Sequence, residues 1–261
     1  MKGIIVAGGV GSRLNPLTRV ASKQLLPVFD KPLIYYPLST LMLSGIRDVL
    51  IISAPSQLLK YRDLLEDGVK LGISIKYQEQ HQPLGIAESL ILGEDFLNGD
   101  KCALVLGDNI FNGPGLGRRL EHFKNVDGAQ VFGYHVKDPR SYGVAILGKD
   151  NEIEALIEKP KNLESNIAIP GLYFFDKQAP KFAKEIHPSA RGELEILDVL
   201  KRYQSLNSLR LEMLPRGTAW FDSGTFEDMH DASTSVRLMQ ERTGDRVGDP
   251  AEAARIRGWI S

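Results

Sequence analysis

The chain has 261 residues, in which 32 lysine and arginine side chains balance 33 aspartate and glutamate side chains, giving a formal net charge of −1. This length allows one large α/β domain or two small ones. The even charge, without a dense basic cluster, argues against a nucleic-acid-binding surface. The single cysteine excludes an intrachain disulfide, and Cys102 is expected to be a buried core residue in a reducing compartment.

Other classes of protein are also disfavoured. No apolar run approaches the roughly 18 residues of a membrane span, and the first residues lack the long apolar stretch of a signal peptide. The five histidines show no zinc-ligand spacing, which argues against a structural zinc site. We therefore expect a cytoplasmic protein without a membrane partner.

Strand-like runs alternate with longer amphipathic runs in the first half of the chain. We predict strands at residues 3–7, 49–53, 73–78 and 103–106, and helices at residues 33–44, 56–65 and 86–96. This alternation predicts a Rossmann-like α/β fold with a mixed, mostly parallel central sheet flanked by helices. Because ligands bind such sheets at the carboxyl ends of the strands, the loop at residues 8–13 should meet the turn Gly107-Asp108-Asn109.

The second half consists of strand-like runs broken by polar turns such as Lys149-Asp150-Asn151, which favours antiparallel additions to the sheet. We predict strands at residues 129–136, 144–147, 153–157 and 172–175, and helices at residues 177–185, 193–203, 226–241 and 250–257. No linker or tandem repeat divides the chain. We expect a single domain over residues 1–261, with a nucleotide-binding part at 1–128, a substrate-binding part at 129–225 and C-terminal helices at 226–261.

A glycine run follows the first predicted strand directly: Gly8-Gly9-Val10-Gly11-Ser12-Arg13. Glycines let backbone N–H groups converge on an anion, while Arg13 and Lys23 supply cationic donors for phosphate oxygens. The run lacks the Lys-Ser or Lys-Thr of a P-loop and the third glycine of a dinucleotide-binding fingerprint. It predicts a polyphosphate cradle, with a plain strand-to-helix turn as the alternative.

Two carboxylates are candidate ligands of Mg²⁺, which proteins typically hold with one or two carboxylates plus phosphate oxygens. Asp108 directly ends an expected central strand, opposite the glycine loop. Asp222 lies in WFDSG, residues 220–224, where it could equally be the N-cap of the following helix.

Charged residues at two further turns are candidate ligand contacts. Glu158-Lys159-Pro160 ends a predicted strand, so that one side chain could face a ligand and the other a phosphate, or the two could form an exposed ion pair. Glu193 suits the positive end of the helix that follows it. Arg191 has no comparable structural role in the sequence and is a candidate second phosphate contact.

The segment Gln80-His81-Gln82-Pro83-Leu84-Gly85 lies between a predicted strand and a predicted helix. Its amide side chain and backbone groups can bind the edge of a pyrimidine base, and Gly85 permits close approach. We interpret His81 as a loop residue and not as a general base. If a phosphorylated substrate reacts with a bound nucleotide here, its attacking phosphate is already anionic at neutral pH and needs no base.

Six segments in unbroken order carry a resemblance to one enzyme family: GGVGSRLNPLT (8–18), SKQLLP (22–27), KPLIYYPL (31–38), LGDN (106–109), EKP (158–160) and RGELEI (191–196). With them the chain closely resembles the glucose-1-phosphate thymidylyltransferases, or dTDP-glucose pyrophosphorylases, from Lys2 to about Ile260. The resemblance implies a fold of the nucleotide-diphospho-sugar transferase type. It also implies a reaction in which dTTP and α-D-glucose 1-phosphate give dTDP-glucose and pyrophosphate with Mg²⁺, by in-line attack on the α-phosphorus.

The resemblance also implies a role for each candidate residue. Arg13 and Lys23 would hold the triphosphate, Asp108 and Asp222 would bind Mg²⁺, and Lys159 and Arg191 would hold the sugar phosphate. The nucleoside would contact Gly8, Gln24, Gln80 and Gly85, and the glucose would contact Tyr142, Gly143, Glu158, Ile169 and Tyr173. Val6, Gly9, Pro83 and Asn109 complete the predicted substrate-binding set.

Three features depart from the family pattern. Leu84 stands where familiar members carry aspartate, so UTP or another sugar 1-phosphate stays an alternative substrate. Phe221-Asp222-Ser223 replaces Leu-Asp-Thr and keeps the carboxylate. Typical bacterial members continue beyond the position of Ile260 with helices that help form a regulatory nucleotide site at a subunit interface, so neither feedback inhibition by dTDP-rhamnose nor the usual tetramer carries over by itself.

Two expectations follow for the assembly and the class of protein. We expect a homo-oligomer, either a dimer or a tetramer. A catalytically silent nucleotide-sugar sensor is the alternative from another functional class, but such a sensor would not need the complete set of Arg13, Lys23, Asp108 and Asp222.

Overall fold

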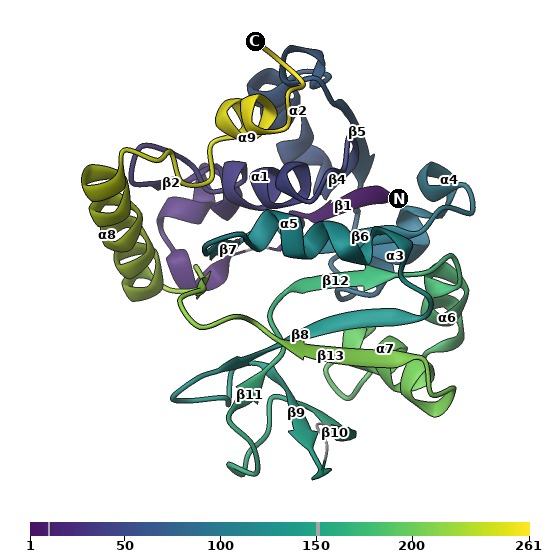
Figure 1. Cartoon of the computed structure of the whole chain (residues 1–261). Helices are drawn as coiled ribbons and strands as arrows, with labels where there is room; N and C mark the ends of the chain where they lie inside the picture. The colour runs from purple at the N-terminus through teal and green to yellow at the C-terminus, as the bar shows by residue number, and fades with distance from the viewer. Residues whose placement is uncertain (10, 150–151) are drawn as a thin grey trace.

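A computed structural model describes residues 1–9, 11–149 and 152–261 of the chain. Val10 of the glycine run and Asp150 and Asn151 of the predicted polar turn lie outside the described residues. Figure 1 shows a central sheet with helices on both of its faces. Among the residues that the structure describes, no helix combines the length and the apolar character needed to cross a membrane.

Four parallel strands form one side of the sheet, as the apolar runs of the first half predict. They are β1 (Lys2–Val6), β4 (Asp48–Ser53), β5 (Ser74–Glu79) and β6 (Cys102–Leu106), in the order β5-β4-β1-β6. All three pairings between them are parallel. Cys102 is fully buried in β6, as predicted, and burial raises the pKa of its thiol to about 12.

The second half extends this sheet mainly with antiparallel strands. Beyond β6 the order is β12 (Leu172–Phe175), β8 (Ala129–His135), β11 (Ile167–Ala168), β9 (Gly143–Leu147) and β10 (Ile153–Glu158), each antiparallel to its neighbour. The short strand β11 is not predicted, and neither is β13 (Leu209–Met213), which pairs parallel with β8. The predicted antiparallel additions to the sheet are confirmed, and β13 is a parallel exception to them.

Short paired strands flank the main sheet. These are β2 (Pro27–Val28) with β3 (Lys31–Pro32), and β7 (Asn109–Asn112) with β14 (Ala219–Asp222), and both pairs are antiparallel. None of the four is predicted from the sequence, because runs of two to four residues leave no periodicity to detect. The β7–β14 pair matters for function, since it places Asp222 beside Asn109.

The helices cover both faces of the sheet and one side of the molecule. They are α1 (Tyr35–Leu43), α2 (Pro55–Leu65), α3 (Glu88–Leu92), α4 (Glu94–Leu97), α5 (Leu116–Glu121), α6 (Ala179–Glu185), α7 (Ile196–Ser205), α8 (Phe226–Thr243) and α9 (Pro250–Ile256). Short 3₁₀ segments occur at Ser12–Leu14, Leu17–Arg19, Lys23–Leu25, Val69–Leu71 and His122–Asn125.

The prediction of one continuous helix at residues 86–96 is wrong. Residues 86–96 form two short helices, α3 and α4, that are separated at Gly93. A Cβ atom at this position would lie 2.8 Å from Cδ1 of Ile4 in β1. Close approach to the sheet therefore requires glycine here, and glycine also weakens the helix. Helix α5 is also absent from the predicted helices.

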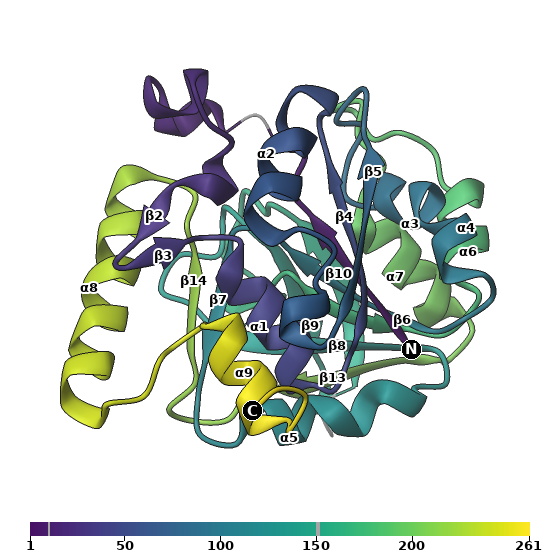
Figure 2. The same cartoon turned by 90° about the horizontal axis from the view of Figure 1, so that it is seen from above.

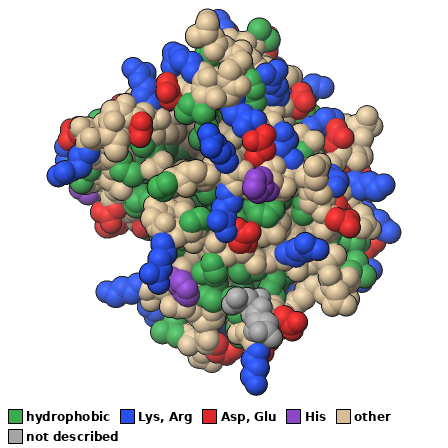
Figure 3. All heavy atoms as spheres, in the orientation of Figure 1, with side chains coloured by type: hydrophobic (Ala, Val, Ile, Leu, Met, Phe, Trp, Pro, Cys, Tyr) green, Lys and Arg blue, Asp and Glu red, His purple; other side chains and the backbone are tan. Residues whose placement is uncertain are grey.

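Alternating side chains of the parallel strands belong to two hydrophobic cores, one on each face of the sheet. Ile5, Ile51 and Val105 pack on one face with the helix α1, while Ile4, Leu50 and Leu104 pack on the other face with α7. A third cluster joins α8 to the β2–β3 and β7 region, and Figure 2 shows α8 standing on that side of the molecule. On the face drawn in Figure 3, acidic and basic side chains are interspersed, which agrees with the even net charge.

Candidate active site

A cavity of about 310 Å³ opens where the loop after β1 meets the turn after β6. Arg13 and Lys23 line it from the first of these segments, and Asp108 and Asn109 line it from the second. The predicted meeting of the glycine loop with the Gly107-Asp108-Asn109 turn is confirmed. The reason is the parallel pairing of β1 with β6, which brings the carboxyl ends of the two strands to the same edge of the sheet.

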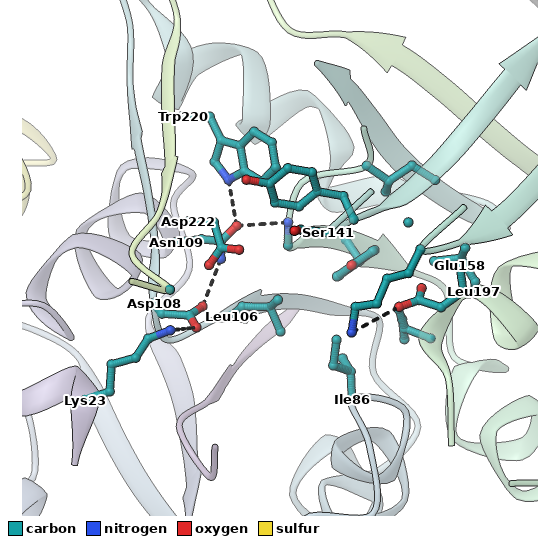
Figure 4. A pocket seen from close by; sticks show the side chains of 18 of the residues that line it. Lys23, Ile86, Leu106, Asp108, Asn109, Ser141, Glu158, Leu197, Trp220 and Asp222 are labelled. Atoms are coloured by element: carbon teal, nitrogen blue, oxygen red, sulfur yellow. Dashed lines mark hydrogen bonds and ion pairs between the residues drawn. The ribbon is translucent and has the colours of Figure 1, made fainter. Parts of the chain in front are cut away.

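A buried ion pair occupies one side of this cavity. The Nζ atom of Lys23 lies 2.6 Å from Oδ2 of Asp108, and the two side chains are only 10% and 21% exposed. The amide Nδ2 of Asn109 donates a hydrogen bond of 2.9 Å to the other oxygen, Oδ1 of Asp108. Figure 4 shows that both oxygens of this carboxylate are engaged. A cation and a carboxylate thus share a site with little water to screen them.

Asp222 reaches the same place from β14, because β14 pairs with β7 in a register that sets Asp222 opposite Asn109. The alternative that Asp222 caps the following helix is wrong. Thr225 is the N-cap of α8, and it forms a capping box with Asp228. Burial and, to a smaller extent, the nearby carboxylate of Asp108 raise the pKa of Asp222 to about 7, while Lys23 opposes the shift.

The opposite wall of the cavity comes from the second half of the chain. Glu158 ends β10, and Lys159 follows it with a positive φ of 44°, so the strand turns away at the predicted point. The Nζ atom of Lys159 lies 3.7 Å from Oε1 of Glu158. Burial raises the pKa of Glu158, and Lys159 and Arg191 lower it. Tyr142, Gly143, Ile169 and Tyr173 also line the cavity.

Arg191 has structural partners that the sequence analysis does not find. Its guanidinium donates two hydrogen bonds of 2.8 Å to the two oxygens of Glu195 and one of 3.1 Å to Glu158. Glu195 is the N-cap residue of α7 and its side chain is 10% exposed. The interpretation of Arg191 as free of any structural role is therefore wrong, because a helix start brings Glu195 within its reach. Arg191 does not line the cavity itself; it contacts Glu158, which does.

The residues predicted for the nucleoside lie outside this cavity, next to the glycine loop. A Cβ atom at Gly8 would lie 1.8 Å from Oε1 of Gln80, so the amide oxygen of Gln80 lies directly against Gly8. The Nε2 atom of Gln80 donates a hydrogen bond of 2.6 Å to Glu88, whose carboxylate also accepts one from the backbone of Leu84. Since a carboxylate only accepts, the amide of Gln80 has its oxygen toward Gly8. Val6, Gly9 and Pro83 likewise do not line the cavity.

Two other predicted contacts are explained by packing in this structure. Gly85 has a φ of 116°, and a Cβ atom there would lie 2.4 Å from the carbonyl oxygen of Leu194, so the close approach is to the segment before α7. Gln24 is buried, and its Oε1 accepts hydrogen bonds from Ser22 and Tyr61. His81 is 77% exposed and lies beside Glu79, in agreement with its interpretation as a loop residue.

Comparison with known proteins identifies the family. The sequence model for the nucleotidyl transferases matches residues 2–238. The chain is 48% identical to the glucose-1-phosphate thymidylyltransferase of Mycolicibacterium smegmatis over 260 residues, which are 100% of this chain and 90% of that protein. It is 47% identical to the protein of the same name from Neisseria meningitidis, over 100% of this chain and 91% of the relative. The chain belongs to this nucleotidyl transferase family.

Solved structures agree with this membership. A putative glucose-1-phosphate thymidylyltransferase from Bacillus anthracis, in complex with a sucrose, superposes with a TM-score of 0.84 at 38% identity and covers 91% of this chain and 95% of its own. A UDP-glucose pyrophosphorylase complexed with UDP-glucose superposes with a TM-score of 0.81 at 22% identity, over 92% of this chain and 99% of its own, and shows the same fold. The predicted nucleotide-diphospho-sugar transferase type of fold is confirmed.

The side chains of this transferase also suit a divalent cation. Mg²⁺ prefers oxygen ligands and is usually held by one or two carboxylates together with substrate phosphates. Asp108 and Asp222 supply two carboxylates on one wall of the cavity, where burial and then the charge of Asp108 raise the pKa of Asp222, and a bound cation would oppose both effects. Within the described residues no group of three or more His, Cys, Asp or Glu side chains could hold a metal ion. The donor set therefore fits a cation shared with phosphate oxygens better than a fully protein-bound one.

Several residues of the transferase site are missed by the sequence analysis. Trp220 is the most prominent, and Ser141, Ile86, Gly171 and Leu197 also line the cavity. The ring of Trp220 packs against Tyr142, with centroids 5.0 Å apart. Its position two residues before Asp222 in the run WFDSG was the available indication, because alternate residues of a strand share a face.

Proposed function

We propose that this chain transfers dTMP from dTTP to α-D-glucose 1-phosphate, giving dTDP-glucose and pyrophosphate. The observation that carries the proposal is the gathering of Lys23, Asp108 and Asp222 on one wall of the cavity, with Glu158 and Lys159 on the opposite wall. Relatives at 48% and 47% identity bear the name of this activity. Charges on two facing walls suit a reaction that joins a triphosphate to a sugar phosphate.

In the proposed reaction an oxygen of the sugar phosphate attacks the α-phosphorus of dTTP in line with the leaving pyrophosphate. The attacking phosphate is already an anion, so no protein base is needed. Arg13 and Lys23 hold the triphosphate and neutralise charge that develops on the pyrophosphate. Phosphoryl transfer of this kind depends on positioning and charge stabilisation.

Asp108 and Asp222 would hold Mg²⁺ in this proposal. When bound, the cation would neutralise phosphate charge and help to align the α-phosphate. Lys23 has to exchange its contact with Asp108 for a phosphate oxygen, which its flexible side chain allows.

On the other wall, Lys159 and Arg191 would bind the phosphate of the sugar. Tyr142, Gly143, Glu158, Ile169 and Tyr173 would surround the glucose, and Asn109 would complete the wall toward Asp108. Arg191 already makes four hydrogen bonds with Glu195 and Glu158 through its Nε and Nη2 atoms, so its Nη1 donors would be the ones to contact the phosphate.

The nucleoside would lie beside the glycine loop, with Gln80 as its base contact and Val6, Gly8, Gly9, Gln24, Pro83 and Gly85 around it. The amide oxygen of Gln80 offers an acceptor, which suits the N3–H of thymine or uracil. Thymine and uracil differ by one methyl, worth about 1–3 kcal/mol in an apolar pocket, so UTP is the nearest alternative substrate.

The proposal extends to the arrangement and assembly of the chain. Residues 1–128 would bind the nucleotide and residues 129–225 the sugar phosphate, with residues 226–261 as C-terminal helices. We also propose that the protein is a cytoplasmic homo-oligomer, either a dimer or a tetramer. Light scattering of the purified protein measures the mass of the assembly and distinguishes the two.

The test is pyrophosphate release with Mg²⁺ in an assay that crosses four nucleoside triphosphates with several sugar 1-phosphates. We expect dTTP with glucose 1-phosphate to react fastest, and Asp108→Asn to serve as the inactive control. Preference for UTP or another sugar would replace the substrate assignment but keep the reaction. Binding of dTTP without turnover of any pair would support a silent sensor and overturn the enzyme.

A further inference from the structure

Asn109 has an amide whose orientation is fixed by its surroundings. The residue is 2% exposed, and its Oδ1 accepts hydrogen bonds from Nε1 of Trp220 at 2.7 Å and from the backbone N–H of Gly171 at 3.1 Å. Both partners are donors only, so the amide atom that faces them is the oxygen. The amide nitrogen must then point the other way.

That nitrogen fixes the carboxylate of Asp108. Nδ2 of Asn109 donates to Oδ1 of Asp108 at 2.9 Å, while Nζ of Lys23 lies 2.6 Å from Oδ2. Figure 4 shows the chain of contacts running from Trp220 through Asn109 to Asp108 and Lys23. With one donor on each oxygen, the plane of the carboxylate is set before any ligand arrives.

Trp220 is itself held rigidly. The residue is 9% exposed, and its ring packs against Tyr142 at 5.0 Å and edge-on against Tyr134 at 5.5 Å between centroids. An indole that is clamped between two aromatic rings presents its N–H in one direction. The donor that orients Asn109 is therefore fixed by packing.

We infer that Trp220 is a positioning residue for Asp108 and acts through the amide of Asn109. The inference rests on the proposed role of Asp108 as a ligand of a divalent cation. Partners that orient a metal ligand typically change metal affinity or activity by about 10-fold to 100-fold when removed. Any contact of the Trp220 ring with substrate would be a separate role, which the experiment must distinguish.

The variants are Trp220→Phe, which keeps a ring but loses the N–H donor, and Asn109→Ala, which removes the whole link. Tyr134→Phe is the matched control, because it removes a donor from the same aromatic cluster whose hydrogen bond goes to the backbone of Thr218 instead. The double variant Trp220→Phe with Asn109→Ala completes a mutant cycle. Circular dichroism confirms that each variant folds.

The first measurement is the binding of Mn²⁺ to the protein alone. The electron paramagnetic resonance signal of the free ion reports how much Mn²⁺ stays unbound. We expect the half-saturating Mn²⁺ concentration to rise about tenfold in Trp220→Phe and about 10-fold to 100-fold in Asn109→Ala. The double variant should equal Asn109→Ala, since Trp220 has nothing left to orient. Tyr134→Phe should match the unmodified protein.

The second measurement is steady-state kinetics with glucose 1-phosphate. We expect kcat to fall in parallel with Mn²⁺ binding while KM for glucose 1-phosphate stays within about threefold of its original value. If the effects of the two single changes on Mn²⁺ binding multiply in the double variant, the inference is overturned. A raised KM with unchanged Mn²⁺ binding would also overturn it and would assign Trp220 to the sugar. If the unmodified protein binds Mn²⁺ but shows no turnover, the proposed function fails while the inference is still decided by the binding data.

Discussion

The two halves of this molecule supply their cationic side chains to the site in different ways. Lys23, from the half with parallel strands, has a side chain that is 10% exposed and, among the described residues, pairs with one carboxylate, that of Asp108. Arg191, from the half with antiparallel strands, is 37% exposed and lies within 3.5 Å of three carboxylates. A flexible, nearly buried lysine with one partner can change that partner for a phosphate, whereas an arginine held by three is fixed in place. We therefore expect Lys23 to act in the chemical step and Arg191 in binding.

The largest effect should come from Lys23→Ala. Removing a charge that stabilises the leaving pyrophosphate should lower kcat about 100-fold to 1000-fold, with a much smaller change in KM for glucose 1-phosphate. Steady-state pyrophosphate release measures both constants. Lys70→Ala is the control, because the side chain of Lys70 is 79% exposed and forms an ion pair with Glu66 on the surface. A kcat that does not change would refute the role of Lys23.

Arg191→Lys tests the other side of the comparison. Lysine keeps the charge but cannot engage both oxygens of Glu195 together with Glu158, so KM for glucose 1-phosphate should rise about 10-fold to 100-fold. The control is Arg202→Lys, in α7, whose side chain is 50% exposed beside Glu185. If kcat falls more than KM rises, the distinction between the two cations does not hold.

Asp222 lies where the two halves meet, and its titration makes metal use dependent on pH. A carboxylate with a pKa of about 7 is mostly protonated at pH 6 and mostly ionised at pH 8. Because the proton competes with the cation, the Mg²⁺ concentration for half-maximal rate should fall about tenfold over this range. Rates at fixed substrate with varied Mg²⁺ measure it. A half-maximal concentration that stays constant between pH 6 and pH 8 would contradict the raised pKa.

The same shift predicts a change in stability. The folded-state pKa is raised above the ordinary value of 3.8, so the contribution of Asp222 to folding is fully present below about pH 4 and is lost as the pH rises through about 7. Asp222→Asn removes this loss. Its free energy of unfolding in urea should exceed that of the unmodified protein by roughly 1 kcal/mol or more at pH 8 and by less at pH 4.

The smallest expected effect concerns the base. In the variant Glu88→Gln, residue 88 can donate as well as accept a hydrogen bond, so it no longer selects the amide nitrogen of Gln80 as its partner. The orientation of the Gln80 amide, and with it the acceptor beside Gly8, is then less well fixed. The preference for dTTP over dCTP in kcat/KM should fall about threefold to tenfold. Glu79→Gln is the control, because the side chain of Glu79 is 53% exposed and its carboxylate pairs with the exposed His81. An unaltered preference would remove Glu88 from base selection.

Much of the fold could be predicted because three of the four parallel strands, β1, β4 and β6, are largely continuous apolar runs. The predicted strand at residues 49–53 differs from β4, Asp48–Ser53, by one residue. By contrast β13, Leu209–Met213, alternates with the charged Arg210 and Glu212, and none of its five residues is fully buried. Its pairing with β8 joins residues about 80 positions apart, and such distant pairing leaves no local pattern.

The site shows the same division. The position of Asp108 followed from the rule that ligands bind at the carboxyl ends of parallel strands. Asp222 could not be separated from a helix cap, because the choice depended on the pairing of β14 with β7 across more than 100 residues. Trp220 was missed for the same reason, since its hydrogen-bond partner Asn109 is 111 positions away.

The sequence by itself determined the parallel sheet, the glycine loop and the charged residues that carry the chemistry, because each depends on neighbours along the chain. Only the tertiary structure decided which charges are paired. In the folded chain Arg191 pairs with Glu195 and Glu158, and Lys23 pairs with Asp108. The amide oxygen of Asn109 accepts a hydrogen bond from Trp220. Hydrogen bonds and ion pairs act over a few ångströms in space, and the residues that make the decisive ones here are mostly far apart in the chain.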